Sequence, residues 1–123
     1  MKYSDLSDFE INKLVSKVLL DDKSHWSTWI TDDGCRKVWF VDESKNNEPI
    51  PFNPCNNPSD AWPIIVENKI AIKPKLITKK EYATPSDYID GWEAKVHSTW
   101  FEDKNPLRAA MIVFLMMNEG ETK

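Results

Sequence analysis

Residues 105–117 read Asn-Pro-Leu-Arg-Ala-Ala-Met-Ile-Val-Phe-Leu-Met-Met, and this stretch decides how the chain folds at its C-terminal end. Asn105-Pro106 is a strong helix start, because Asn caps a first turn and Pro is tolerated at the first helical position. Residues 109–117 are apolar on nearly every side, and such a helix is buried, either in the core or against a partner. The sequence therefore predicts a buried helix that ends before Gly120.

A second stretch, residues 55–68, reads Cys-Asn-Asn-Pro-Ser-Asp-Ala-Trp-Pro-Ile-Ile-Val-Glu-Asn and also predicts a helix. A start at Asn57-Pro58 would place Pro63 inside the helix, where it removes a hydrogen bond. With Ser59 as the N-cap, Pro63 falls among the first four residues, whose N–H groups have no intrahelical partner. We therefore predict a helix over about 60–67, with one turn before it as an alternative. We expect its buried stripe to contain Trp62, Ile65 and Val66.

The N-terminal part of the chain predicts an amphipathic helix over about 8–20. Ser7 and Glu10 have the spacing of a capping box, in which each side chain accepts the backbone N–H of the other residue. The apolar residues that follow recur at helical spacing and define one face. They are Ile11, Leu14, Val15, Val18 and Leu19.

The remaining regular segments predict strands. Residues 26–30 and 36–41 are rich in aromatic and β-branched residues, and the Asp-Asp-Gly between them favours a hairpin. Residues 42–58, with four prolines, predict a surface connection without regular structure, of a length that is often functional. A strand follows at about 70–76, limited by Pro74, and the alternating run 92–101 predicts another.

These elements follow the order α-β-β-α-β-β-α. Strands and helices do not alternate regularly enough for a doubly wound parallel sheet. We therefore predict an α+β fold, with three helices packed on a small, largely antiparallel sheet of about four strands. Because 123 residues fall within the usual size of one domain, we expect residues 1–123 to form a single domain.

The two stretches above, together with residues 3–13 (Tyr-Ser-Asp-Leu-Ser-Asp-Phe-Glu-Ile-Asn-Lys), resemble the NinX-like family of small proteins from the nin region of lambdoid phages and their prophage remnants. The resemblance covers both ends and the middle of the chain, whereas residues 21–50 and 78–91 match no pattern. It implies a small cytoplasmic protein of phage or prophage origin. It brings no activity, cofactor or catalytic residue to this chain.

Charge and hydropathy narrow the possible partners. Sixteen Lys and Arg against twenty Asp and Glu give a net charge of −4, which disfavours sequence-independent binding of nucleic acid. The chain has no signal-like start and no apolar run near the ~18 residues of a membrane span, so we expect a cytoplasmic protein without a membrane partner. Several clustered lysines form either a basic patch or a protected edge strand. They are Lys69, Lys73, Lys75, Lys79 and Lys80.

The sequence favours a protein that is not an enzyme. A cysteine nucleophile would have to come from Cys35 or Cys55, with His25 or His97 as its base, but no spacing, elbow or third group links them. The same four residues lack the spacing of a metal site, and scattered carboxylates predict no cation site. We expect reduced thiols, no catalytic residue, no bound metal and no cofactor.

Two functional hypotheses remain. In the first, the protein is a phage accessory protein that binds a host or phage protein, or a second copy of itself, and the apolar final helix and six tryptophans leave room for such an interface. In the second, it binds or sequesters a small anionic, nucleotide-type ligand, held by helix N-termini and stacked on an aromatic ring. Arg108 would then serve the ligand, unless it pairs at the surface with Glu102 or Asp103. The candidate ligand-binding residues are Asn56, Asn57, Asp60, Trp62, Asn105 and Arg108.

Overall fold

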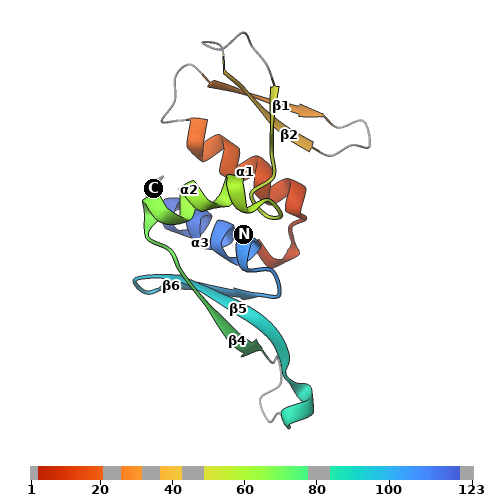
Figure 1. The fold of residues 1–123 in the computed structure, drawn as a ribbon, viewed down its shortest axis with the longest axis vertical. Helices are drawn as coiled ribbons and strands as arrows, with labels where there is room; N and C mark the ends of the chain where they lie inside the picture. Colours follow the sequence, from red (N-terminus) through yellow and green to blue (C-terminus); the bar gives the residue numbers. More distant parts are fainter. Residues whose placement is uncertain (1–2, 21–25, 32–36, 43–48, 78–83, 120–123) are drawn as a thin grey trace.

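The computed structural model describes residues 3–20, 26–31, 37–42, 49–77 and 84–119, and within these ranges it has three α-helices and six β-strands. The helices form a middle layer between two antiparallel sheets, β1–β2–β3 on one side and β4–β5–β6 on the other (Figure 1). The predicted α+β class, with three helices and antiparallel strands, is confirmed. The elements are α1 (Asp8–Leu20), β1 (Trp26–Thr31), β2 (Lys37–Asp42), β3 (Pro49–Phe52), α2 (Pro58–Asn68), β4 (Ala71–Ile77), β5 (Ile89–Val96), β6 (Thr99–Asp103) and α3 (Pro106–Glu119).

The described residues form six strands in two sheets, where we expected about four strands in one sheet, and two local differences account for the extra strands. Residues 49–52, within the connection that we expected to be irregular, form β3 and pair with β2, so that expectation is wrong there. The alternating run 92–101 is two strands, because the chain turns at His97, whose φ is 55°. The predicted hairpin of β1 and β2 is confirmed, with Trp29 paired to Trp39, while its turn lies outside the described residues.

The predicted first helix is confirmed from Asp8 to Leu20. The capping box forms as expected: the Glu10 N–H donates to Ser7 Oγ at 3.2 Å, and the Ser7 N–H donates to Glu10 Oε1 at 3.4 Å. Ile11 and Val15 are fully buried on its inner face. This local start signal therefore fixes where α1 begins and which face it buries.

Helix α2 begins two residues earlier than we preferred. Its N-cap is Asn57, with Pro58 at the first helical position, so the predicted Ser59 cap is wrong. Pro63 lies inside the helix. The stabilisation from the Asn57 cap and Pro58 at the first position therefore exceeds the cost of the hydrogen bond that Pro63 removes.

The buried stripe of α2 also differs from the prediction. Ala61, Ile64 and Ile65 are buried, whereas Trp62 is 63% exposed and Val66 is 53% exposed. Helix α2 packs against α3, so its buried side is the one that faces the core. The exposed aromatic and aliphatic side chains of α2 consequently point away from the core.

Helix α3 is the centre of the fold. It contacts α1 and α2 on one side and β5 and β6 on the other, and residues 109–115 are all buried. The prediction of a buried C-terminal helix is confirmed, and its apolar surface lies in the core. The strand predicted at about 70–76 is observed as β4, and Pro74 does not limit it, which is tolerated because β4 is an edge strand.

Candidate functional site

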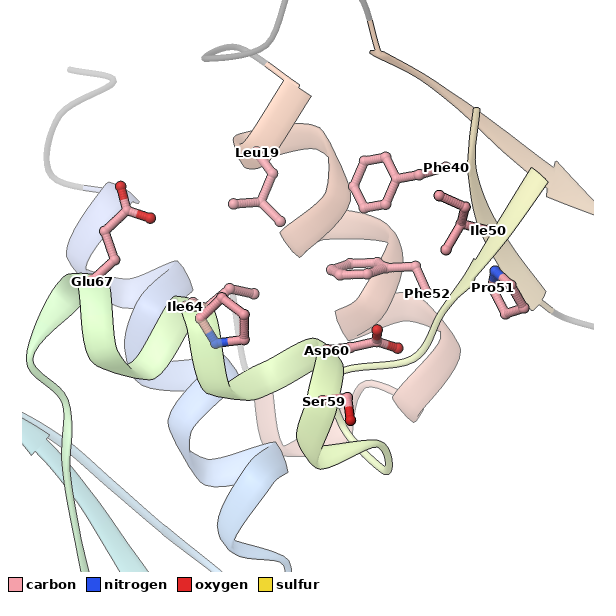
Figure 2. Close-up of a pocket in the computed structure, with 10 residues that line it drawn as sticks. Leu19, Phe40, Ile50, Pro51, Phe52, Ser59, Asp60, Ile64 and Glu67 are labelled. Carbon is pink, nitrogen blue, oxygen red and sulfur yellow. The ribbon is translucent and has the colours of Figure 1, made fainter. Parts of the chain in front are cut away.

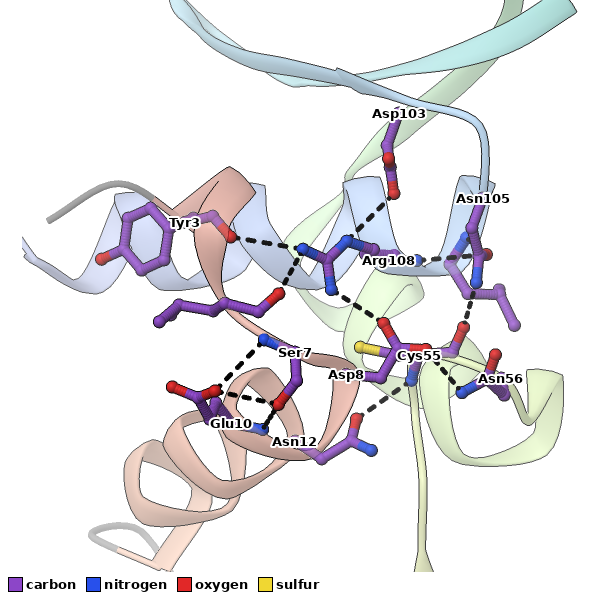
Figure 3. A network of polar contacts seen from close by, with 12 residues as sticks. Tyr3, Ser7, Asp8, Glu10, Asn12, Cys55, Asn56, Asp103, Asn105 and Arg108 are labelled. Carbon is purple, nitrogen blue, oxygen red and sulfur yellow. Dashed lines mark hydrogen bonds and ion pairs between the residues drawn. The ribbon is translucent and has the colours of Figure 1, made fainter. Parts of the chain in front are cut away.

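Arg108, in the first turn of α3, lies in a polar network that ties α3 to α1 and to the residues before it (Figure 3). Its Nη1 is 2.7 Å from Asp8 Oδ1, and its Nε is 3.2 Å from Asp103 Oδ2. Its Nη2 donates to the carbonyl oxygens of Leu6, at 2.6 Å, and Tyr3, at 3.3 Å. The Arg108 side chain is only 13% exposed. The guanidinium therefore binds carboxylates and carbonyl oxygens of the protein itself.

The same network holds the turn at residues 53–57, directly before α2. The Cys55 N–H donates to Asn12 Oδ1 at 3.2 Å, and the Cys55 carbonyl accepts from Asn105 Nδ2 at 2.6 Å. Asn12 also donates to Asn53 Oδ1 at 2.8 Å. The backbone N–H and C=O of Cys55 are thus held between α1 and the start of α3.

Two further candidate residues take part in holding this turn. Asp60 Oδ2 accepts the Asn53 N–H at 2.9 Å, and Asn56 Nδ2 donates to Asp8 Oδ2 at 3.0 Å. Asp8 therefore joins Arg108 to the turn through its two oxygens (Figure 3). The structure brings these predicted residues together, in contacts that position α2 against α1 and α3.

The N-termini of α2 and α3 are occupied by their own caps. Each cap is followed by proline, which has no N–H. The Asn57 side chain accepts the Ser59 N–H at 3.0 Å, and the Asn105 side chain accepts the Leu107 N–H at 2.9 Å. The next N–H groups of each first turn bond to the same two asparagines. These bonds use the N–H groups that we expected to hold an anionic ligand.

Cys55 is buried, and its pKa is raised to about 12, mainly by desolvation and also by the nearby Asp8 carboxylate. A thiol with this pKa holds its proton near neutral pH and is a poor nucleophile. His97 lies at the turn between β5 and β6. Cys35 and His25 lie outside the described residues.

We therefore expect Cys55 to resist a thiol reagent at pH 8 until the protein unfolds. In a Cys35→Ser variant, which leaves one thiol, Ellman's reagent should titrate that thiol only after denaturant is added. The same shift predicts a dependence on pH: the free energy of unfolding should fall as pH rises from about 9 towards 12. The reason is that the thiol of the unfolded chain ionises above about pH 9, whereas the thiol of the folded protein keeps its proton. Rapid labelling of the folded variant would contradict the burial.

A polar pocket of about 530 Å³ lies between α1, β2, β3 and the start of α2. It brings together three of the predicted ligand-binding residues, Asn56, Asn57 and Asp60, whereas Trp62, Asn105 and Arg108 do not line it. Its charged lining residues are Asp8, Asp60 and Lys37. Two carboxylates against one lysine disfavour an anion in this pocket.

An apolar groove of about 260 Å³ lies between α1, α2 and the sheet β1–β2–β3 (Figure 2). Leu19 from α1, Phe40 from β2 and Ile64 from α2 line it, and β3 closes it with Ile50 and Phe52 (Figure 2). The rings of Phe40 and Phe52 contact edge to face, with centroids 4.5 Å apart. Ile50 is 45% exposed, so the groove is open to a partner.

Trp62 and Val66 are exposed on α2 but do not line the groove. Pro63 and Ile64 line the groove from α2, and the helical repeat places Trp62 and Val66 on the solvent side of the same helix. The sequence pattern indicated Trp62 as a candidate site residue, but it did not indicate Ile50 or the other β3 residues that line the groove. The alternation in Pro-Ile-Pro-Phe at residues 49–52 is the signal that would have predicted β3.

The lysines of β4 are on an edge strand, as one of the two interpretations predicted. Lys73 and Lys75 lie 3.4 and 3.1 Å from the Glu93 carboxylate, and Lys75 is also 3.6 Å from Glu102. The hydrogen bond from Lys75 is the main cause that lowers the pKa of Glu93. These two lysines therefore form a mixed-charge surface. Lys79 and Lys80 lie outside the described residues.

Comparison with known proteins places the chain in one family. A phage family described as Bacteriophage P22, NinX matches residues 2–118, which is nearly the whole chain. No curated protein and no solved structure matches it. In the part of the chain that the structure describes, no helix is long and apolar enough to cross a membrane.

Proposed function

We propose that this chain, which belongs to the P22 NinX family and is thus a phage accessory protein, is non-enzymatic and binds a host or phage protein through the apolar groove between α2 and β3. The observation that carries the proposal is the groove itself. Ile50 lines this cavity and is 45% exposed, the cavity walls are largely apolar, and exposed apolar surface marks sites of protein association.

The size of the groove supports a macromolecular partner. Small-molecule sites usually measure about 300–1,000 Å³ and enclose most of the ligand. At about 260 Å³ the groove is smaller than this range. Apolar side chains that project from a partner protein fit a shallow groove of this kind, because a few anchors in pockets provide most of the binding energy of an interface.

The test compares two isoleucines with the same exposure. Ile50 in β3 and Ile89 in β5 are each 45% exposed, and they lie in different sheets. We expect tagged wild-type protein and Ile89→Glu to retain the same stoichiometric partner from infected cells, and Ile50→Glu to lose it. Quantitative mass spectrometry measures the recovery, and light scattering shows whether the partner is a second copy. The proposal is wrong if Ile50→Glu still retains the partner, or if the wild-type protein retains no partner.

The second candidate function is binding of a small ligand in the polar pocket. Its volume of about 530 Å³ falls within the usual range for such sites, and Asn56, Asn57 and Asp60 line it. The carboxylates of Asp8 and Asp60 favour a ligand that donates hydrogen bonds over one that is strongly anionic. Thermal-shift screening with nucleotides and nucleosides tests this candidate. If no compound raises the melting temperature at millimolar concentration, the candidate is removed.

A further inference from the structure

The charged side chains among the described residues that line the apolar groove are all acidic. Among its described lining residues, Asp60 and Glu67 are acidic and none is Lys or Arg. Figure 2 shows the two carboxylates at separate positions along α2, across from the apolar side chains of β2 and β3. They are seven positions apart in the sequence, which corresponds to about 10 Å along a helix at ~1.5 Å per residue.

We infer that the groove takes a protein segment with apolar anchors on one side and two Lys or Arg residues about 10 Å apart, which meet Asp60 and Glu67. This inference rests on the proposed function, because it names the chemistry of the partner that the groove would bind. Charges at the rim of an interface determine which partner binds and how fast it associates. An acidic rim therefore selects a basic amphipathic segment among the apolar segments that fit the groove.

The same charges disfavour the other occupants of an apolar groove. Phosphate groups of a nucleic acid or a lipid would meet two carboxylates and a chain with a net charge of −4. A second copy of this chain carries the same net charge of −4, which disfavours its approach to an acidic groove. Complementary charge therefore points to a basic segment of another protein.

The test selects random 12-residue peptides displayed on yeast for binding to the intact protein. Each selected peptide is then measured against Ile50→Glu and its matched control Ile89→Glu, both checked for folding by thermal melts. We expect peptides that bind wild type and Ile89→Glu, fail to bind Ile50→Glu, and carry apolar residues together with an excess of Lys and Arg.

A charge reversal on the exposed side of α2 gives an independent readout. We expect Glu67→Lys to weaken a selected basic peptide roughly tenfold, because the reversal replaces attraction with repulsion. A peptide with its Lys changed to Glu should recover binding to this variant. This swap does not depend on the Ile50 variant, so the inference stays testable if Ile50→Glu fails to fold.

The outcomes separate the inference from the proposed function. Groove-dependent peptides without an excess of Lys and Arg, or indifferent to Glu67→Lys, would overturn the inference and leave the groove as a binding site. Peptides that bind Ile50→Glu as well as wild type, or an absence of binding peptides, would count against the groove itself and therefore against both.

Discussion

Replacing Arg108 with alanine is expected to lower the free energy of unfolding by about 3 kcal/mol. The guanidinium is 13% exposed, pairs with the carboxylates of Asp8 and Asp103 and donates to the Leu6 carbonyl, so its removal leaves two carboxylates without their cation and this carbonyl without that donor. The loss falls at the low end of the usual ~3–5 kcal/mol, because the Asp8 side chain is 41% exposed and water can solvate it.

Urea melts of the purified variant measure this loss, with Lys104→Ala as the control. Lys104 is an exposed cation four residues before Arg108, and its removal should change stability by no more than about 0.5 kcal/mol. If Arg108→Ala is as stable as wild type without any ligand, the structural role is wrong. Arg108 would then be free to serve a ligand, as the alternative hypothesis held.

Helix starts were the part of the fold that the sequence predicted best. Ser7 and Glu10 define the start of α1, and Asn105-Pro106 defines the start of α3, because each signal acts within one turn of backbone. The start of α2 was mistaken when the cost of an internal Pro63 was weighed above the Asn57 cap. The Asn57 cap was therefore a better guide to the start of α2 than the rarity of proline inside helices.

Contacts between distant residues were the part that the sequence did not reveal. For Arg108 it suggested Glu102 or Asp103, which are close in the chain, and of these Asp103 is a partner. Asp8, its nearer partner at 2.7 Å, is one hundred residues away and appears in the sequence only as a first-turn acid of α1. A pairing across that separation depends on how α1 packs on α3, which no local pattern contains.

The groove escaped prediction for a related reason. Both possible stripes of α2 are apolar, and the side that α3 covers decides which of them remains exposed. The opposite wall comes from β3, a strand in a proline-rich segment that pairs only at the edge of its sheet. The groove between α2 and β3 forms only when both elements have packed, so no local sequence pattern predicts it.

The buried core of α3 and the exposed face of α2 should contribute very differently to stability. Ile112→Ala should cost about 3 kcal/mol, within the ~2–5 kcal/mol of large-to-small changes at buried sites, because Ile112 is fully buried in the helix that contacts α1, α2, β5 and β6. Trp62→Ala, at a residue that is 63% exposed, should change stability by no more than about 0.5 kcal/mol. Denaturant melts of the two variants give the comparison. A large loss for Trp62→Ala would mean that this ring stabilises the fold, and a small loss for Ile112→Ala would mean that α3 is not the packed centre.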